Sequence, residues 1–142
     1  TWNPQTESRT KYLHGGNTMQ PNQANYMHED APGDTMKTVS FPDVETPYGL
    51  YDTAGNVWEW SENWFFPSDL MDGEYGLSGD LASLFSGVEK SVRGGSWAHE
   101  VSTIPLWQRA SQPPQWCTPF TGFRIVIVPI PGSHTELPGG TR

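Results

Sequence analysis

Hydrophobic residues are unevenly spread along the chain, and its first third has no regular hydrophobic period. Residues 1–40 are rich in Asn, Gln, Thr and Gly, and neither strand-like alternation nor a helical period persists beyond a few positions. This pattern predicts loops, with residues 1–20 as an extended polar segment ahead of a folded domain at 21–128. The Pro- and Gly-containing residues 129–142 are expected to form a tail or linker.

Two later segments carry the strongest strand signals. Residues 91–97 run into Gly94 and Gly95, which predicts a strand that enters a tight turn with positive φ. Residues 122–128 form a β-branched run ended by a proline, which predicts a buried central strand. The aromatic-rich segment 41–64 is the best candidate for other ordered structure.

Between these segments the pattern predicts irregular structure. Residues 98–121 contain Trp107, Trp116 and several prolines without a clear period, which is typical of an ordered surface loop. Residues 66–90 are acidic and contain glycine, and they predict an insertion loop with a short helix at 80–85.

Composition and charge narrow the class of protein. A chain of 142 residues with 15 Gly and 13 Pro has room for one loop-rich domain and excludes a helical bundle or coiled coil. Sixteen acidic against eight basic residues give a formal net charge of −8, which disfavours nucleic acid and anionic membrane surfaces as partners. No apolar stretch is long enough for a membrane span, so we expect no membrane insertion.

Three motifs in order along the chain resemble those of one known family. They are Gly49-Leu50-Tyr51-Asp52-Thr53-Ala54-Gly55-Asn56-Val57-Trp58-Glu59-Trp60, then Arg93-Gly94-Gly95-Ser96-Trp97, then Gly122-Phe123-Arg124. Over about residues 20–128 the sequence resembles the formylglycine-generating enzyme, or sulfatase-modifying factor, family. The resemblance implies an α+β fold of C-type-lectin-like architecture, with a small twisted antiparallel sheet, long irregular loops and little helix. Family domains are longer, so this chain is similar to their carboxy-terminal half.

The resemblance also implies bound Ca²⁺ at one or two sites. At the first site, the family would supply the side chains of Asp52 and Glu59 and the carbonyl groups of Gly55 and Val57. Calcium prefers such a set of hard oxygen ligands, and a turn containing glycine can wrap them around one ion. The alternative is that Asp52 caps a turn and Glu59 is a solvated acid.

A second calcium site would lie in the earlier loop region. The matching positions are the side chain of Asn25, the carbonyl of Tyr26, the acid Asp30 and the carbonyl of Pro32, with Asp34 as an alternative acid. Asn and Asp residues in loops also satisfy local turns without metal.

The oxidase chemistry of the family is not expected here. By resemblance, the aerobic enzymes bind copper and activate oxygen with two cysteines just after the Gly-Gly-Ser-aromatic motif. Residues 98–104 contain no cysteine, and the single Cys117 lies too far along the chain to replace either. We therefore expect no copper and no catalytic residues, and Ser96, without an activating base, is interpreted as a turn hydroxyl. The sequence favours a protein without enzymatic activity over an enzyme, which stays as an alternative hypothesis.

A set of aromatic and cationic residues in and before the 98–121 loop could contact a ligand. These candidates are Trp97, His99, Trp107, Arg109 and Trp116. For each there is a structural alternative: Trp side chains pack against the sheet, His99 is a surface histidine, and Arg109 holds an ion pair or carbonyl groups.

Three hypotheses for function remain. The first is a non-catalytic, calcium-braced binding or surface-assembly module whose contact surface is the 98–121 loop and whose ligand is a protein or glycan. The second is a divergent copper-dependent formylglycine-generating oxidoreductase, or a part of one, that acts on a protein cysteine. The third is a structural subunit that contacts neighbouring subunits in a homo-oligomer or hetero-complex. Calcium binding favours an extracellular, periplasmic or cell-surface location, where free calcium is high.

Overall fold

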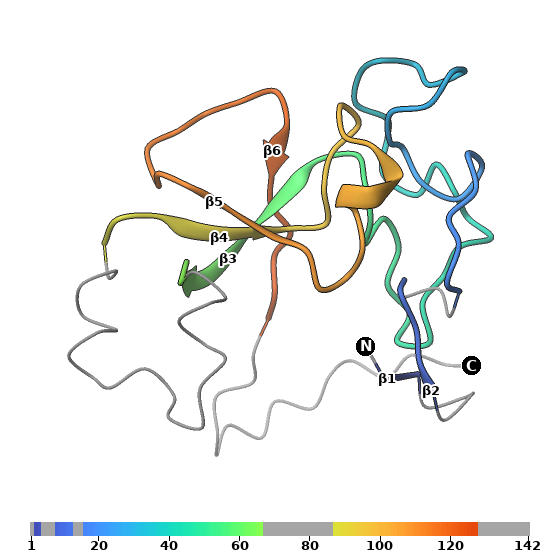
Figure 1. Cartoon of the computed structure of the whole chain (residues 1–142), viewed down its shortest axis with the longest axis horizontal. Helices are drawn as coiled ribbons and strands as arrows, with labels where there is room; N and C mark the ends of the chain where they lie inside the picture. Colours follow the sequence, from blue (N-terminus) through green and yellow to red (C-terminus); the bar gives the residue numbers. More distant parts are fainter. Residues whose placement is uncertain (1, 4–7, 13–15, 67–86, 128–142) are drawn as a thin grey trace.

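The fold is a small mixed sheet joined to a larger region of loops (Figure 1). The computed structural model describes residues 2–3, 8–12, 16–66 and 87–127. A four-stranded sheet has the order β5-β4-β3-β6. Its strands are β3 (Trp58–Trp64), β4 (Lys90–Arg93), β5 (Arg109–Gln112) and β6 (Thr121–Gly122). A separate antiparallel pair joins β1 (Trp2–Asn3) to β2 (Ser8–Arg9), and the described helical structure is the 3₁₀ turn η2 (Val101–Thr103).

The centre of the sheet is the antiparallel pair β3 and β4. Trp60 lies opposite Val92, and the register shifts between Trp60 and Trp64. Val92 and Trp58 are buried, which places one face of this pair against the rest of the chain. The prediction of ordered structure within residues 41–64 is therefore confirmed for β3.

The sheet is mixed, so the expectation of an antiparallel sheet is right for the pairs β5-β4 and β4-β3 and wrong for the pair β3-β6. Strand β6 runs parallel to β3, with Trp58 opposite Thr121 and Glu59 opposite Gly122. The connection that follows β5 carries the chain from one edge of the sheet to the other, and a connection of this kind lets β6 enter in the same direction as β3.

Strand β5 was missed because its sequence carries no hydrophobic alternation. It lies inside the segment 98–121 that was expected to be irregular, and it pairs antiparallel with β4, with Ala110 opposite Val92. The strand reads Arg-Ala-Ser-Gln and lies at an edge, where its place is set by backbone pairing with β4 and a side-chain pattern is not required.

The prediction of a buried central strand at 122–128 was also wrong. Strand β6 ends at Gly122, it is the other edge of the sheet, and the side chains of 123–127 are exposed. Residue 128 lies outside the described residues. The β-branched composition indicates a tendency to form a strand, but within the described chain residues 123–127 pair with no strand, and of their side chains Arg124 is the one held by hydrogen bonds.

The main core cluster lies in the loop region beside the sheet. Tyr12, Met19, Ala24, Tyr26 and Ile104 are buried together, and Ala54 packs against them. Two of these residues come from the expected polar segment 1–20, which therefore contributes to the same core as the later loops.

The turn after β4 has the predicted geometry. Gly94 and Gly95 have φ values of 93° and 77°, in the left-handed region that favours glycine. A Cβ atom on Gly95 would lie 3.1 Å from Ile104 Cβ and closer still to its methyl group, so the glycine also lets the turn approach the core.

Other predictions fall outside the described residues: most of the insertion loop at 66–90, its helix at 80–85, and the tail at 129–142. In the part of the chain that is described, no helix has the length and apolar character needed to span a membrane.

Gly55 supplies a direct test of how closely the loops pack. We expect Gly55→Ala to lower the free energy of unfolding by about 3 kcal/mol or more, because the new Cβ would overlap the backbone of Asn25 and lie 2.9 Å from its carbonyl carbon, at a φ of 72°. Gly33→Ala is the matched control. Its φ is 69° but nothing lies within 4 Å, so only the left-handed cost of about 1 kcal/mol is expected. Equal losses in the two variants, measured by urea unfolding, would contradict this packing.

Candidate functional site

The candidate site is built around a hydrogen-bonded junction of loops at Asn56. The Asn56 backbone N–H donates to Asn25 O at 2.6 Å, and its carbonyl accepts from Trp97 N at 3.0 Å. Its side-chain Oδ1 accepts from Met36 N at 2.8 Å and from Asn25 Nδ2 at 3.0 Å. Asn56 has a φ of 65°, which asparagine tolerates better than most residues, and Gly55 beside it donates to Gly94 O at 2.7 Å.

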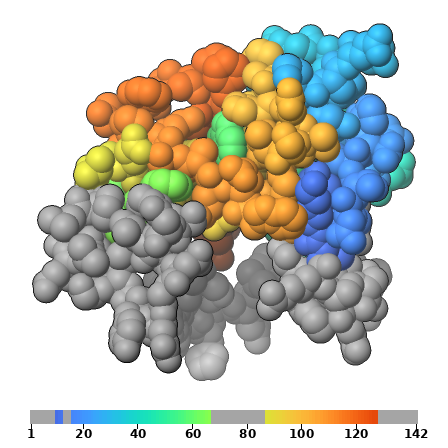
Figure 2. Space-filling model, in the orientation of Figure 1, coloured from blue at the N-terminus to red at the C-terminus, as the bar shows by residue number. Residues whose placement is uncertain are grey.

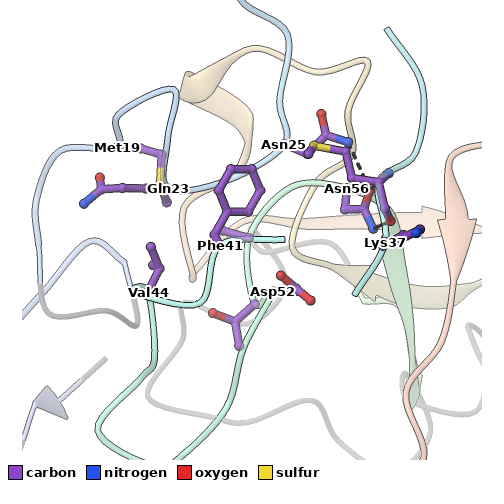
Figure 3. Close-up of a pocket in the computed structure, with 11 residues that line it drawn as sticks. Met19, Gln23, Asn25, Lys37, Phe41, Val44, Asp52 and Asn56 are labelled. Carbon is purple, nitrogen blue, oxygen red and sulfur yellow. Dashed lines mark hydrogen bonds between the residues drawn. The ribbon is translucent and has the colours of Figure 1, made fainter. Parts of the chain in front are cut away.

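Asn25 lies at the buried side of this junction and lines a small cavity. The cavity has a volume of about 20 Å³, and Figure 3 shows Asn25, Asn56 and Asp52 among the residues around it. Asn25 Nδ2 also donates to Asp34 O at 2.9 Å. Asn25 Oδ1 is buried and has no hydrogen-bond partner among the described atoms, which is uncommon for a buried amide oxygen.

The residues of the predicted second calcium set differ in burial. Tyr26 is buried in the core, whereas Asp30 and Pro32 are exposed. The acid whose backbone contacts Asn25 is Asp34, the alternative to Asp30, and its Oδ1 accepts from Thr35 N at 2.6 Å.

Glu59, a member of the first predicted calcium set, forms an ion pair with Arg124. Both carboxylate oxygens of Glu59 accept hydrogen bonds from the Arg124 guanidinium, which also donates to Asp52 O at 2.9 Å and to Tyr51 O at 3.2 Å. The hydrogen bonds to Glu59 raise the pKa of Arg124. The Asp52 side chain accepts from Val39 N at 2.6 Å. Arg124 thus connects the chain after β6 to β3 and to the turn before it.

Two open cavities flank this ion pair. One has a volume of about 310 Å³ and includes Val39, Leu50, Val57 and Phe123 in its lining; the other, of about 270 Å³, includes Leu50, Leu106 and Arg93. Glu59 and Arg124 line both. A mixed apolar and charged lining of this kind can hold a peptide segment or a small ligand.

Ser96 has a partner that the sequence did not reveal. Ser96 Oγ lies 2.6 Å from His99 Nδ1, and the His99 ring packs edge-to-face on Trp58 with ring centroids 5.4 Å apart. Because Ala98 N donates to the same Oγ, the arrangement is consistent with the Ser96 hydroxyl donating to a neutral His99. Ser96 is fully buried, so the pair holds the turn together without offering a nucleophile to solvent.

The proposed ligand-contacting residues fall into two groups. Trp107 and Trp116 are 60% and 58% exposed, and Figure 2 shows their loop, in orange, over much of one face of the molecule. Trp97 Nε1 instead donates to Pro119 O at 3.3 Å, and Arg109 donates to Phe66 O at 3.0 Å while lying over the Phe65 ring. His99 has the contacts with Ser96 and Trp58 given above.

The single cysteine and the other candidate metal-binding side chains are not clustered in the described chain. Cys117 is exposed and free. Within residues 2–3, 8–12, 16–66 and 87–127, no group of three or more His, Cys, Asp and Glu side chains could hold a metal ion. The two predicted calcium sets differ from such a group, because they rely on amide and carbonyl oxygens as well as on carboxylates.

Comparison with known families now identifies the domain. The family described as "Sulfatase-modifying factor enzyme 1-like domain" matches residues 4–129. The chain belongs to the sulfatase-modifying factor family. The resemblance seen in the three motifs is thus confirmed, and the match takes in most of the amino-terminal segment as well.

Curated proteins that are similar to this chain carry different names. A protein named serine/threonine-protein kinase pkn1 from Chlamydia caviae is 32% identical over 109 residues, which are 77% of this chain and 16% of the relative. A formylglycine-generating enzyme from Streptomyces coelicolor is 32% identical over 80 residues, 54% of this chain and 24% of that enzyme. The mouse formylglycine-generating enzyme is 26% identical over 131 residues, 82% of this chain and 34% of that enzyme. The chain therefore spans about a third or less of each of these relatives.

Sequence reasoning missed the residues that organise this sulfatase-modifying factor domain. Asn56 lies inside the first motif, but the resemblance to the family pointed to Asp52 and Glu59 as metal ligands and not to the asparagine between them. An Asn directly after Gly, in a segment with few strand signals, was a usable sign of left-handed backbone and local hydrogen bonding.

His99 predicts a pH dependence of stability. Burial lowers the pKa of His99 below its usual value of about 6.5, so the unfolded chain takes up a proton at a higher pH than the folded chain does. His99 should therefore contribute its full stability above about pH 6.5 and lose it progressively as the pH falls toward the folded-state pKa.

The measurement is urea unfolding between about pH 7.5 and 5, with His99→Gln compared with wild type. Carboxylates and other histidines titrate in both proteins, so the difference between the two curves isolates His99. A wild-type curve that runs parallel to the His99→Gln curve would contradict this assignment.

Proposed function

We propose that this sulfatase-modifying factor domain is a non-catalytic binding module with a C-type-lectin-like, calcium-braced scaffold. The observation that carries the proposal is the pair of exposed tryptophans, Trp107 and Trp116, in the 98–121 segment. Exposed tryptophans in a loop that follows a rigid strand pair are typical of contact surfaces, where a large aromatic side chain supplies affinity at low entropic cost.

The segment that would carry oxidase chemistry supports this assignment. It follows Gly94 and Gly95, it contains no cysteine, and its His99 is engaged with the buried Ser96. A single exposed Cys117 cannot supply the pair of thiolates that two-coordinate copper needs. A relative named as a kinase also matches 77% of this chain, so sequences similar to this domain are not confined to proteins named as formylglycine-generating enzymes.

The surroundings of Trp107 suit recognition of a protein or glycan. A cavity of about 260 Å³ is lined by Phe65, Trp107, Gln108 and Arg109. It combines aromatic faces with an amide and a cation, groups that stack on sugar rings or apolar side chains and hydrogen-bond to hydroxyl or carbonyl oxygens.

Calcium would stabilise the loops at Asn25. Two oxygens, Asp34 O and Asn56 Oδ1, converge on Asn25 Nδ2, while Asn25 Oδ1 is buried without a partner. The N and O atoms of a side-chain amide are assigned from hydrogen bonding alone, and a reversed amide would bring three oxygens together. Three converging oxygens would favour a bound cation between them, and amide and carbonyl oxygens suit calcium. With its amide reversed, Asn25 would thus offer calcium a set of neutral oxygens, in which the backbone carbonyl of Asp34 takes part where the carboxylate of Asp30 was expected.

The set at Asp52 and Glu59 fits less directly. Calcium could bind Glu59 only if the carboxylate exchanged Arg124 for the ion, since both its oxygens are hydrogen-bonded to the guanidinium. The carbonyl groups of Gly55 and Val57 would complete that site. Calcium dependence would favour an extracellular, periplasmic or cell-surface location, where the ion is abundant.

Calcium binding is tested by thermal and urea unfolding with chelator and with excess calcium. At about 100 times the dissociation constant, calcium should add about 2.7 kcal/mol to the free energy of unfolding. Asn25→Ala should abolish this increment, and Asn22→Ala, at an exposed position nearby, should retain it. Glu59→Gln tests separately whether calcium binds the set at Asp52 and Glu59. An increment of zero after confirmed metal removal, or one that survives Asn25→Ala, would exclude calcium at Asn25.

The contact surface is tested with a glycan array and a displayed random-peptide library, both probed with the labelled protein. For binders so found, Trp107→Ala or Trp116→Ala should weaken binding by about tenfold or more, the cost of losing a central aromatic contact. Tyr48→Ala, which removes an aromatic side chain of similar exposure outside this loop, should leave affinity within about twofold.

The competing enzymatic function predicts a different result. A chain that consumed oxygen and converted a cysteine-containing peptide to formylglycine after copper loading would refute the non-catalytic assignment. Binders insensitive to both tryptophan substitutions would refute the proposed surface.

A further inference from the structure

The chain directly after β6 is an exposed apolar segment. Phe123, Ile125, Val126 and Ile127 are 75%, 82%, 74% and 88% exposed, and only Arg124 among residues 123–127 has a polar side chain. Single exposed apolar residues are ordinary, but a run of this length marks an interaction surface. Its β-branched residues also have the composition of a strand.

The backbone of this segment is available for pairing. Strand β6 is an edge of the sheet, and it pairs with β3 only at Thr121 and Gly122. Within the described part of the chain, Phe123 and residues 125–127 make no hydrogen bond, and Arg124 is held through its side chain. An unpaired edge with strand-forming side chains is a template for another strand.

The surroundings favour an uncharged, apolar partner. Phe123 shares the cavity of about 310 Å³ with Val39 and Leu50, which are themselves 48% and 44% exposed. The charge of Arg124 is compensated by Glu59, so the edge is close to neutral although the whole chain carries −8. Apolar side chains of a docked strand could fill this cavity while its backbone pairs with residues 123–127.

We propose that residues 123–127 form the docking edge for an extended polypeptide strand that lies outside these 142 residues and belongs to the remaining part of a sulfatase-modifying factor protein. Such polypeptide is abundant in the family, because the matched region is only 24% of the Streptomyces coelicolor enzyme and 34% of the mouse enzyme. A second copy of this chain is a poorer occupant, since each copy carries a net charge of −8 and the two would repel. The docked strand continues the sheet beyond β6 and covers the apolar run.

The probe is a set of overlapping synthetic peptides of about 15 residues, long enough for one strand, that tile the unmatched part of the Streptomyces coelicolor enzyme. Binding to the whole 142-residue chain is measured by fluorescence anisotropy, with scrambled peptides of the same composition as controls. We expect peptides with alternating apolar residues to bind, and their scrambled forms to bind at least about tenfold more weakly.

Two proline variants test whether the backbone is the docking element. Successive N–H groups point to opposite sides of an extended strand. One of the two variants, Ile125→Pro or Val126→Pro, should therefore remove an N–H group that faces the partner and weaken binding by about tenfold or more. Ile127→Lys tests the apolar surface without restricting the backbone. Val88→Lys, an exposed valine ahead of β4, is the matched control and should bind as wild type does. Unchanged thermal unfolding shows that each variant is folded.

The outcomes separate this proposal from its alternatives. Peptide binding that is lost in a proline variant and in Ile127→Lys supports the docked strand. A dimer in light scattering that these variants dissociate would assign the edge to a second copy and overturn the proposed occupant. Absence of binding by any peptide, or binding unaffected by all three variants, also overturns it. The measurements are made with chelator present, and none of these readouts depends on calcium at Asn25 or on the exposed tryptophans.

Discussion

The loop region depends on the hydrogen bonds that one residue, Asn56, makes through both its side chain and its backbone. In a domain with few strands, most backbone groups of the loops must find partners in other loops, because leaving them buried and unpaired is costly. Asn56 meets this need for the segments at Asn25, Met36 and Trp97, and its neighbour Gly55 bonds to Gly94. The left-handed backbone at Asn56 orients both its peptide and its side-chain amide toward these segments. The main core cluster can then form beside the junction without regular secondary structure.

A second connection, through Arg124, joins the junction to the sheet. Its guanidinium contacts Glu59 on β3 and the carbonyl groups of Tyr51 and Asp52 in the turn before it. A planar guanidinium can make several directed hydrogen bonds of this kind, whereas a lysine would supply only a point charge. The geometry explains how the Gly-Phe-Arg motif and the first motif depend on each other although they lie far apart in sequence.

The sequence predicted those features whose cause is local. The two glycines after β4 predicted positive φ angles, and the structure has positive φ at both Gly94 and Gly95. The family could be recognised from three motifs, and with it the near absence of helix in the residues that the structure describes. Strand β5 could not be found, because its polar residues are placed by pairing with β4. The buried strand expected at 122–128 is absent from its described part for a related reason. The composition indicates a tendency to form a strand, but burial depends on what covers the edge. Within the site, the resemblance pointed to the acids Asp52 and Glu59 and not to the organising asparagine, because hydrogen-bonded junctions leave only a weak pattern in sequence.

The sheet edge and the proposed metal set at Asp52 and Glu59 are coupled through Arg124. Arg124 belongs to the apolar run by position, but its side chain holds the carboxylate that calcium would need. A strand that fixed the backbone of residues 123–127 in this arrangement would favour the ion pair and oppose calcium at Glu59. Calcium at Glu59 would in turn release Arg124 and add an uncompensated charge to the edge, weakening an apolar partner. Thermodynamic linkage requires the two effects to be equal in free energy. The set at Asn25 contains no partner of Arg124, so calcium there can stabilise the loops whether or not the edge is covered.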